Sequence, residues 1–231
     1  MDKVAPSVSS SGGGVECKIV LVGDSRSGKT ALVHQFLNDK FLDIYTPTGF
    51  ERYTDNIYIA DKHISFTIWD TSGSTAYDSV RPLAYQDAKV FLLCFHIGQP
   101  ETLDNAINKW YPEIRKHSPN VPVILCGCQC DTRNDIDTIA SLAKMRRIPV
   151  TSEQALNSSR QISATTYVET SAKTSSKNTR EAFEVAVLAA LGRLNKNHVA
   201  MQRQRSYVKS KNKRDLTREL RNKAKTTCIV M

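Results

Sequence analysis

The residues best suited to chemistry in this sequence lie in a short segment bracketed by glycines. Gly23–Thr30 reads GDSRSGKT and fits the pattern G-x-x-x-x-G-K-[ST]. The glycines allow backbone N–H groups to close around phosphate oxygens, Lys29 offers a point charge to the outer phosphates, and the Thr30 hydroxyl suits Mg²⁺. An apolar run precedes the segment and a helical pattern follows it, as the motif requires. The segment therefore predicts a phosphate-binding loop.

Two later segments supply candidate partners for a metal ion at this loop. Asp70 ends a predicted strand, where its carboxylate can hold Mg²⁺ directly or through a water. The segment Tyr45-Thr-Pro-Thr48 lies in a polar loop, from which a threonine can close on the metal and on a γ-phosphate. Alone, YTPT would indicate only a turn. Its position after the phosphate loop favours the ligand role.

Alternating strands and helices would position these side chains. Apolar runs predict two strands around a tight turn at Asp61-Lys62, the second ending at Asp70, and further strands at residues 17–22, 90–97, 121–127 and 166–170. Helical spacing of apolar residues is found over residues 30–41, 101–117, 152–162 and 179–194. This order predicts an α/β fold of the P-loop NTPase class, with a mostly parallel six-stranded sheet flanked by helices. Ligands of such folds bind at the carboxyl ends of the strands.

The positive charge of the chain is concentrated in its tail. The net charge is +9, but the residues from Arg193 onward contain twelve Lys or Arg and only two acidic residues, so the body is nearly neutral. Residues 1–15 are rich in Ser and Gly without an apolar core, which predicts a disordered arm rather than a secretory signal. No stretch approaches the roughly 18 apolar residues of a membrane span.

The six cysteines favour a reducing setting and free thiols, because no secretory signal is predicted. Three of them form Cys126-Gly-Cys128-Gln-Cys130, and alternation in an extended segment is expected to point all three side chains the same way. Zinc prefers four tetrahedral ligands, and no further His or Cys cluster lies nearby in sequence. The segment is therefore not predicted to bind metal.

Several motifs, in order, resemble those of the Ras-like small GTPases: GDSRSGKT, YTPT, WDTSG (69–73), YDSVRPLAY (77–85) and TSAK (170–173). Residues 133–150 resemble the insert helix of the Rho family. The resemblance runs from about Cys17 to Leu194 and implies a small G domain over residues 16–194, with GTP and Mg²⁺ as cofactors. Within the Rho family the chain is most similar to the atypical Rnd subgroup, through Ser25, DTSGS in place of DTAGQ, and GC in place of GN before Asp131.

The resemblance also implies individual roles. Thr30, Thr48 and Asp70 (through a water) would serve Mg²⁺. The phosphates would be held by Gly23, Asp24, Ser25, Arg26, Ser27, Gly28, Lys29, Thr30 and Gly73. The guanine site would consist of Phe41, Cys128, Gln129, Asp131, Ser171, Ala172 and Lys173. The effector loop would consist of Tyr45, Thr46, Pro47, Thr48, Gly49, Phe50, Glu51 and Arg52.

Two substitutions bear on hydrolysis, which requires a positioned water and stabilised charge. Ser74 replaces the family glutamine and is too short to align the water, while Ser25 replaces a glycine beside the γ-phosphate and would crowd an incoming arginine finger. No catalytic residue is therefore expected to be intact, and the protein is predicted to remain GTP-bound.

Two alternatives stay open. One is a slow but active GTPase whose water is aligned by another residue. The other is a scaffold that binds nucleotide weakly, because the family's N-K-x-D is Cys128-Gln129-Cys130-Asp131 here.

The tail, residues 195–231, is predicted to attach the protein to a membrane. Cys228-Ile-Val-Met is a C-a-a-X box whose terminal methionine favours farnesylation, and the basic run 209–225 supplies the second signal that stable anchoring needs. Phosphorylation of Ser206 would weaken this attraction. The expected location is the cytoplasmic face of the plasma membrane, with a cytosolic pool. The expected partners are Rho-pathway effectors and regulators that control actin and cell shape, and no nucleic acid; the protein is expected to be a monomer.

Overall fold

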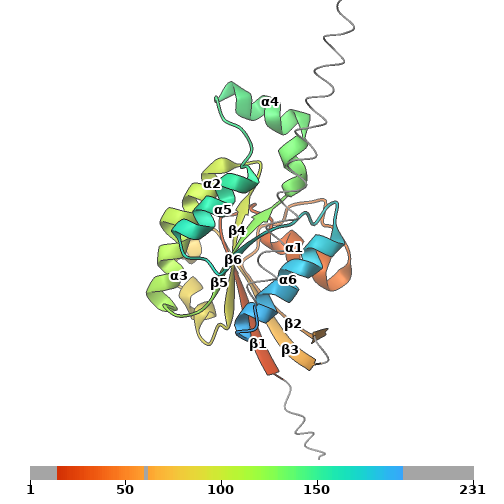
Figure 1. Cartoon of the computed structure of the whole chain (residues 1–231), viewed down its shortest axis with the longest axis vertical. Coiled ribbons are helices and arrows are strands. Elements are labelled where there is room, and N and C mark those ends of the chain that lie inside the picture. The colour runs from red at the N-terminus through yellow and green to blue at the C-terminus, as the bar shows by residue number, and fades with distance from the viewer. Residues whose placement is uncertain (1–14, 60–61, 195–231) are drawn as a thin grey trace, which may run out of the picture.

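Six strands form one sheet, in the order β2-β3-β1-β4-β5-β6 (Figure 1). The computed structural model describes residues 15–59 and 62–194. The strands are β1 (Val15–Val22), β2 (Phe50–Ile59), β3 (Lys62–Thr71), β4 (Val90–His96), β5 (Val123–Cys128) and β6 (Thr166–Glu169). All neighbouring strands run parallel except β2 and β3, which are antiparallel. The predicted α/β class and mostly parallel six-stranded sheet are confirmed.

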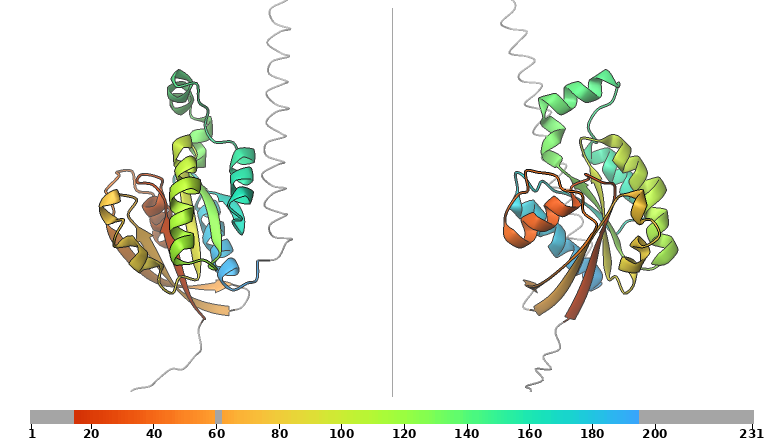
Figure 2. Two further views of the ribbon diagram at one scale, coloured as in Figure 1. Left: turned by 90° about the vertical axis from the view of Figure 1, so that its left-hand side faces the viewer. Right: turned by 180° about the vertical axis from the view of Figure 1, so that it is seen from behind.

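Helices cover both faces of the sheet. α1 (Lys29–Asn38) and α6 (Ser176–Ala190) lie on one face, and α2 (Pro100–Asn105), α3 (Tyr111–His117) and α5 (Ser152–Gln161) lie on the other (Figure 1). α4 (Ile136–Lys144) projects beyond these layers at one end of the molecule (Figure 2). Short helical turns are η1 (Thr75–Tyr77), η2 (Arg81–Tyr85), η3 (Ala106–Trp110) and η4 (Cys130–Asn134). No helix within the described ranges is long and apolar enough to cross a bilayer.

Alternating side chains of β1 enter two separate cores. Ile19 and Leu21 pack with α1 and α6, where Phe36 stacks on Phe183 at 4.1 Å between ring centroids. Val20 and Val22 enter the other core, with side chains of α2, η3, α3 and α5. Every residue of β4 is buried. The sheet is thus held from both sides, as parallel sheets require, and its strand ends are fixed supports for a site.

Two of the differences between the structure and the predicted elements have a clear physical reason. The helix predicted over residues 101–117 begins at Pro100 and widens into the π turn η3, directly before Pro112, which has no N–H for an α-helical bond. β2 begins at Phe50, six residues before the predicted start. Its first half is polar because β2 is an edge strand exposed to solvent, so apolar alternation does not mark it. The predicted turn residue Asp61 lies outside the described residues.

The expectation that three cysteines point the same way is wrong for Cys130. β5 ends at Cys128, and Gln129 has a left-handed backbone with φ of 56°. Cys130 then begins η4 and packs with the core beneath α2 and α3, whereas Cys126 and Cys128 belong to the core beneath α1 and α6. The strand's alternation therefore stops one residue before the third cysteine.

Candidate nucleotide site

The predicted phosphate loop connects β1 to α1. Gly23 and Gly28 have φ of 147° and 103°, where an L side chain is strained, and a Cβ on Gly23 would lie 2.1 Å from the Cys94 carbonyl oxygen. The buried Lys29 ammonium donates to the carbonyl oxygens of Gly23 (2.9 Å) and Asp24 (2.8 Å). Burial lowers the pKa of Lys29, and the nearby carboxylate of Asp70 opposes that shift. The loop therefore holds the Lys29 ammonium against its own tightly packed backbone.

A cavity of about 860 Å³ lies above this loop. Its volume falls in the range typical of small-molecule sites. It is lined by predicted site residues from five separate segments: Ser25, Arg26, Gly28, Lys29, Thr30, Phe41, Tyr45, Thr46, Pro47, Thr48, Glu51, Gly73, Cys128, Gln129, Asp131, Ala172 and Lys173. The remaining predicted site residues do not line it: Gly23, Asp24, Ser27, Gly49, Phe50, Arg52, Asp70, Ser74 and Ser171.

Thr30, Thr48 and Asp70 meet beside the cavity. The Thr30 hydroxyl lies 2.6 Å from that of Thr48 and donates to Asp70 Oδ2 at 2.5 Å. Asp70 is fully buried, and its Oδ1 has no hydrogen-bond partner among the described residues. Burial raises the pKa of Asp70 to about 6, opposed by the Thr30 hydrogen bond and the Lys29 charge. An unpaired buried carboxylate oxygen beside two hydroxyls is an all-oxygen donor set, and it fits Mg²⁺.

The predicted base-binding residues lie together at the other end of the cavity. Ser171 Oγ donates to Asp131 Oδ1 at 2.5 Å, which orients the carboxylate and leaves its second oxygen available to a ligand. Gln129 Nε2 donates to the Arg26 carbonyl oxygen at 3.1 Å. From the sequence, both Cys128 and Gln129 were expected to loosen this end of the site. In the structure the Gln129 amide ties it to the phosphate loop.

Ser25 and Ser74 occupy different surroundings. Ser25 lines the cavity, and Gly73 packs so closely that a Cβ on it would lie 2.2 Å from the Ser25 nitrogen. Ser74 does not line the cavity, and its Oγ accepts a hydrogen bond from the Ala76 N–H at 3.3 Å. The Ser74 hydroxyl therefore caps η1.

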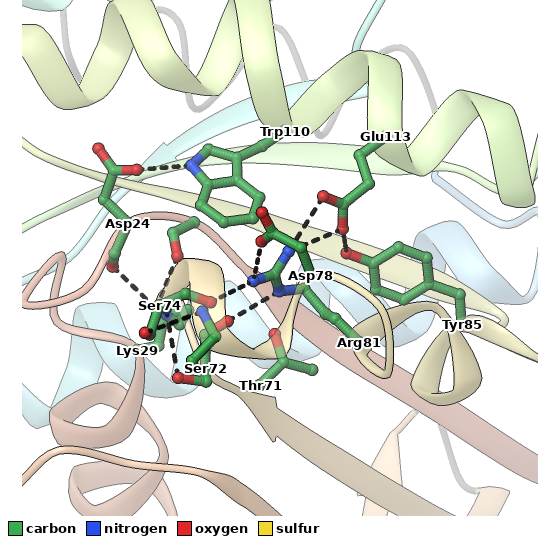
Figure 3. Close-up of polar contacts among 12 residues, drawn as sticks. Asp24, Lys29, Thr71, Ser72, Ser74, Asp78, Arg81, Tyr85, Trp110 and Glu113 are labelled. Carbon is green, nitrogen blue, oxygen red and sulfur yellow. Dashed lines mark hydrogen bonds and ion pairs between the residues drawn. The ribbon is translucent and has the colours of Figure 1, made fainter.

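Sequence reasoning missed Arg81, which holds the loop after β3 (Figure 3). Its fully buried guanidinium donates to the Ser72 and Ser74 carbonyl oxygens, each at 2.8 Å. It also pairs with Glu113 at 3.0 Å and with Asp78 at 2.8 Å. Glu113 lies 32 residues away on α3. No sequence spacing predicts such a pair.

Trp110 extends this network to the phosphate loop. The Arg81 guanidinium lies 4.6 Å from the centre of the Trp110 ring, and Trp110 Nε1 donates to Asp24 Oδ1 at 2.7 Å (Figure 3). Asn105 donates to the other carboxylate oxygen of Asp24 at 2.8 Å. Asp24 is thus held from outside the cavity, and the phosphate loop and the loop after β3 share one support.

The model of the Ras family matches residues 18–191, which covers the phosphate loop, all the cavity segments and α6. This chain belongs to the Ras family. It is 48% identical over 183 residues to the human and mouse proteins named "Rho-related GTP-binding protein RhoE", and 47% identical to that of the pig. The match covers 79% of this chain and 75% of each relative. The family predicted from the motifs is confirmed, and the chain is a Rho-related member.

In this Ras-family chain some residues of the predicted effector loop line the cavity and others lie on the outer surface. The Arg26 guanidinium lies 5.0 Å from the centre of the Tyr45 ring. Phe50 begins β2 and packs edge-on against the Tyr77 ring. Ile44, which neighbours the loop, is 82% exposed, and Leu83 of η2 is 73% exposed. The helix α4 occupies the position of the predicted Rho-type insert, and Ile136 at its start is 80% exposed. Apolar side chains therefore face solvent on three separate segments.

Proposed function

We propose that this protein binds GTP with Mg²⁺ in the cavity and acts as a Rho-type signalling protein that hydrolyses GTP little or not at all. The curated relatives are named as GTP-binding, and the cavity combines a phosphate loop, an oxygen donor set and Asp131. When bound, Mg²⁺ would neutralise charge on the phosphates. Thr30 and Thr48 would hold the metal, Asp70 would orient its water, and Lys29 would contact the outer phosphates.

The observation that supports the proposed low rate of hydrolysis is the placement of the two serines. Hydrolysis depends on an aligned water and on stabilisation of developing charge. The Ser74 hydroxyl is occupied as a helix cap and does not line the cavity. Ser25 lines the cavity beside Gly73, where a side chain in place of the family's glycine would crowd an arginine finger. Such a finger contributes about 10³ to 10⁵ in rate.

The double variant Ser25→Gly, Ser74→Gln tests this proposal. We expect freshly purified wild type to contain mostly GTP, and the double variant to release γ-phosphate at least about tenfold faster in single-turnover assays, since a positioned group typically contributes 10² or more. Ser79→Gln, in the same loop and exposed, is the control and should hydrolyse at the wild-type rate.

The other outcomes separate the alternatives. Wild-type release at the rate of ordinary relatives, or a double variant no faster than its parent, would favour an active GTPase with another water-aligning group. Purified protein without nucleotide would favour a scaffold with a weak guanine site.

We also propose that the protein is anchored at the cytoplasmic face of the plasma membrane, with Rho-pathway effectors docking on the exposed apolar side chains near the cavity and controlling actin organisation. The anchor would be Cys228 with the basic tail, which lies outside the described residues together with Ser206. Farnesylated full-length protein should bind anionic vesicles, and the binding should weaken with salt. Cys228→Ser should remain in solution under the same conditions. Equal binding of both forms would contradict a lipid anchor.

A further inference from the structure

Three cysteine thiols meet beneath the phosphate loop. Cys94 of β4 pairs in register with Cys126 of β5, and Cys128 follows two residues later on the same face. The three sulfur atoms all lie within 4.8 Å of one another, and the Cys126 and Cys128 sulfurs are 3.9 Å apart. All three residues are buried. Because Cys94 comes from a different strand, the sequence around residues 126–130 does not indicate this cluster.

The spacing of the sulfur atoms matches the ligands of a soft divalent cation. A zinc ion bound to thiolates at about 2.3 Å in tetrahedral geometry separates neighbouring sulfurs by ~3.8 Å. Three such ligands leave a fourth position for a water or another group. Cys128 lines the nucleotide cavity, and a Cβ on Gly28 would lie 3.2 Å from Cys128 Cβ. The sulfur cluster therefore adjoins the cavity below the phosphate loop, through Cys128.

A cation lies beside the sulfur cluster. The Lys29 ammonium interacts electrostatically with both Cys94 and Cys128. Binding a divalent cation breaks the S–H bonds of the thiols, forms three metal–sulfur bonds and releases the protons to solvent. The product carries one net negative charge, opposite to that of Lys29.

We propose that Cys94, Cys126 and Cys128 form a binding site for a thiophilic divalent cation of the zinc class. This site goes beyond the proposed GTP and Mg²⁺ binding and is chemically distinct from it, because sulfur ligands select soft cations and the Thr30, Thr48 and Asp70 oxygens select hard ones. The ion would tie β4 to β5 under the phosphate loop. Its fourth position would open toward the nucleotide.

Cadmium is the probe that tests the site, since its bonds to thiolates give an ultraviolet charge-transfer band. Full-length protein carrying Cys228→Ser, which removes the terminal thiol, is titrated with Cd²⁺ and then with competing Zn²⁺ in a phosphine reductant. We expect one equivalent of Cd²⁺ per chain, displaced by Zn²⁺, with affinity that rises with pH because protons are released. Cys126→Val should weaken binding by more than the 10- to 100-fold typical of outer-shell changes.

Cys130→Ser is the matched control, because Cys130 belongs to the same sequence motif but packs in the other core. It should bind Cd²⁺ like its parent. Circular dichroism reports whether each variant folds, and Cys126→Ala replaces Cys126→Val if the larger side chain does not fold. No stoichiometric band, an unchanged band in the Cys126 variant, or loss of the band in Cys130→Ser would overturn the proposal and leave three ordinary core cysteines.

Discussion

Arg81→Leu is expected to lower the free energy of unfolding by about 3 to 5 kcal/mol, the range found when one partner of a buried ion pair is removed. The Arg81 side chain is fully buried, and Glu113 is mostly buried beside it. The leucine would leave Glu113 without its cation and would leave the Ser72 and Ser74 carbonyl oxygens without their donor. Urea unfolding at fixed nucleotide and Mg²⁺ measures the change, because bound ligands shift apparent stability.

A surface arginine provides the comparison. Arg147 pairs with Glu101 at 3.2 Å, but the two side chains are 44% and 55% exposed. Arg147→Ala should therefore cost no more than about 1 kcal/mol, as exposed ion pairs do. Arg81→Lys should lower the free energy of unfolding by an amount between these two, because lysine keeps the charge but not the planar set of donors. If Arg81→Leu cost no more than Arg147→Ala, Arg81 would not be the support of the loop after β3.

Asp70→Asn is expected to stabilise the metal-free protein at neutral pH and to destabilise the protein that contains Mg²⁺. Burial raises the pKa of Asp70 from 3.8 to about 6. Between these two pH values the unfolded carboxyl ionises while the folded one stays protonated, so the stability of the metal-free protein falls as pH rises. Above pH 6 the folded wild type carries a buried charge that the amide of the variant lacks. From pH 4 to pH 7 the wild type should lose about 2 kcal/mol relative to the variant, at 1.36 kcal/mol per pKa unit.

Urea unfolding of metal-free and nucleotide-free protein at several pH values measures this difference, with Asp55→Asn, at an exposed position of β2, measured in parallel. With Mg²⁺ present the wild type should be more stable than Asp70→Asn. The variant should also bind GTP at least about tenfold more weakly than the wild type, a loss of 1.4 kcal/mol. A variant with wild-type Mg²⁺ dependence would show that Asp70 does not support the metal. A flat pH difference would show that burial does not raise its pKa.

Local sequence patterns predicted much of the fold and of the candidate site. The phosphate loop, the strand before it and the helix after it are contiguous in sequence, so one motif and two periodicities predict them together. The cavity brings together residues of the phosphate loop, of YTPT, of the loop after β3, of residues 128–131 and of TSAK. Element boundaries were wrong where the local sequence pattern is weak, as at the polar first half of β2 and at the helix that widens before Pro112.

What the sequence by itself determined was the family, the order of the elements and the chemistry of the loop, because each depends on residues that are neighbours in the chain. Tertiary structure alone decided that Arg81 meets Glu113, that Trp110 holds Asp24, and that Cys94 joins Cys126 and Cys128. It also decided that the Ser74 hydroxyl caps η1. These contacts follow from strand order, register and helix packing, which place distant residues side by side and which no local spacing encodes.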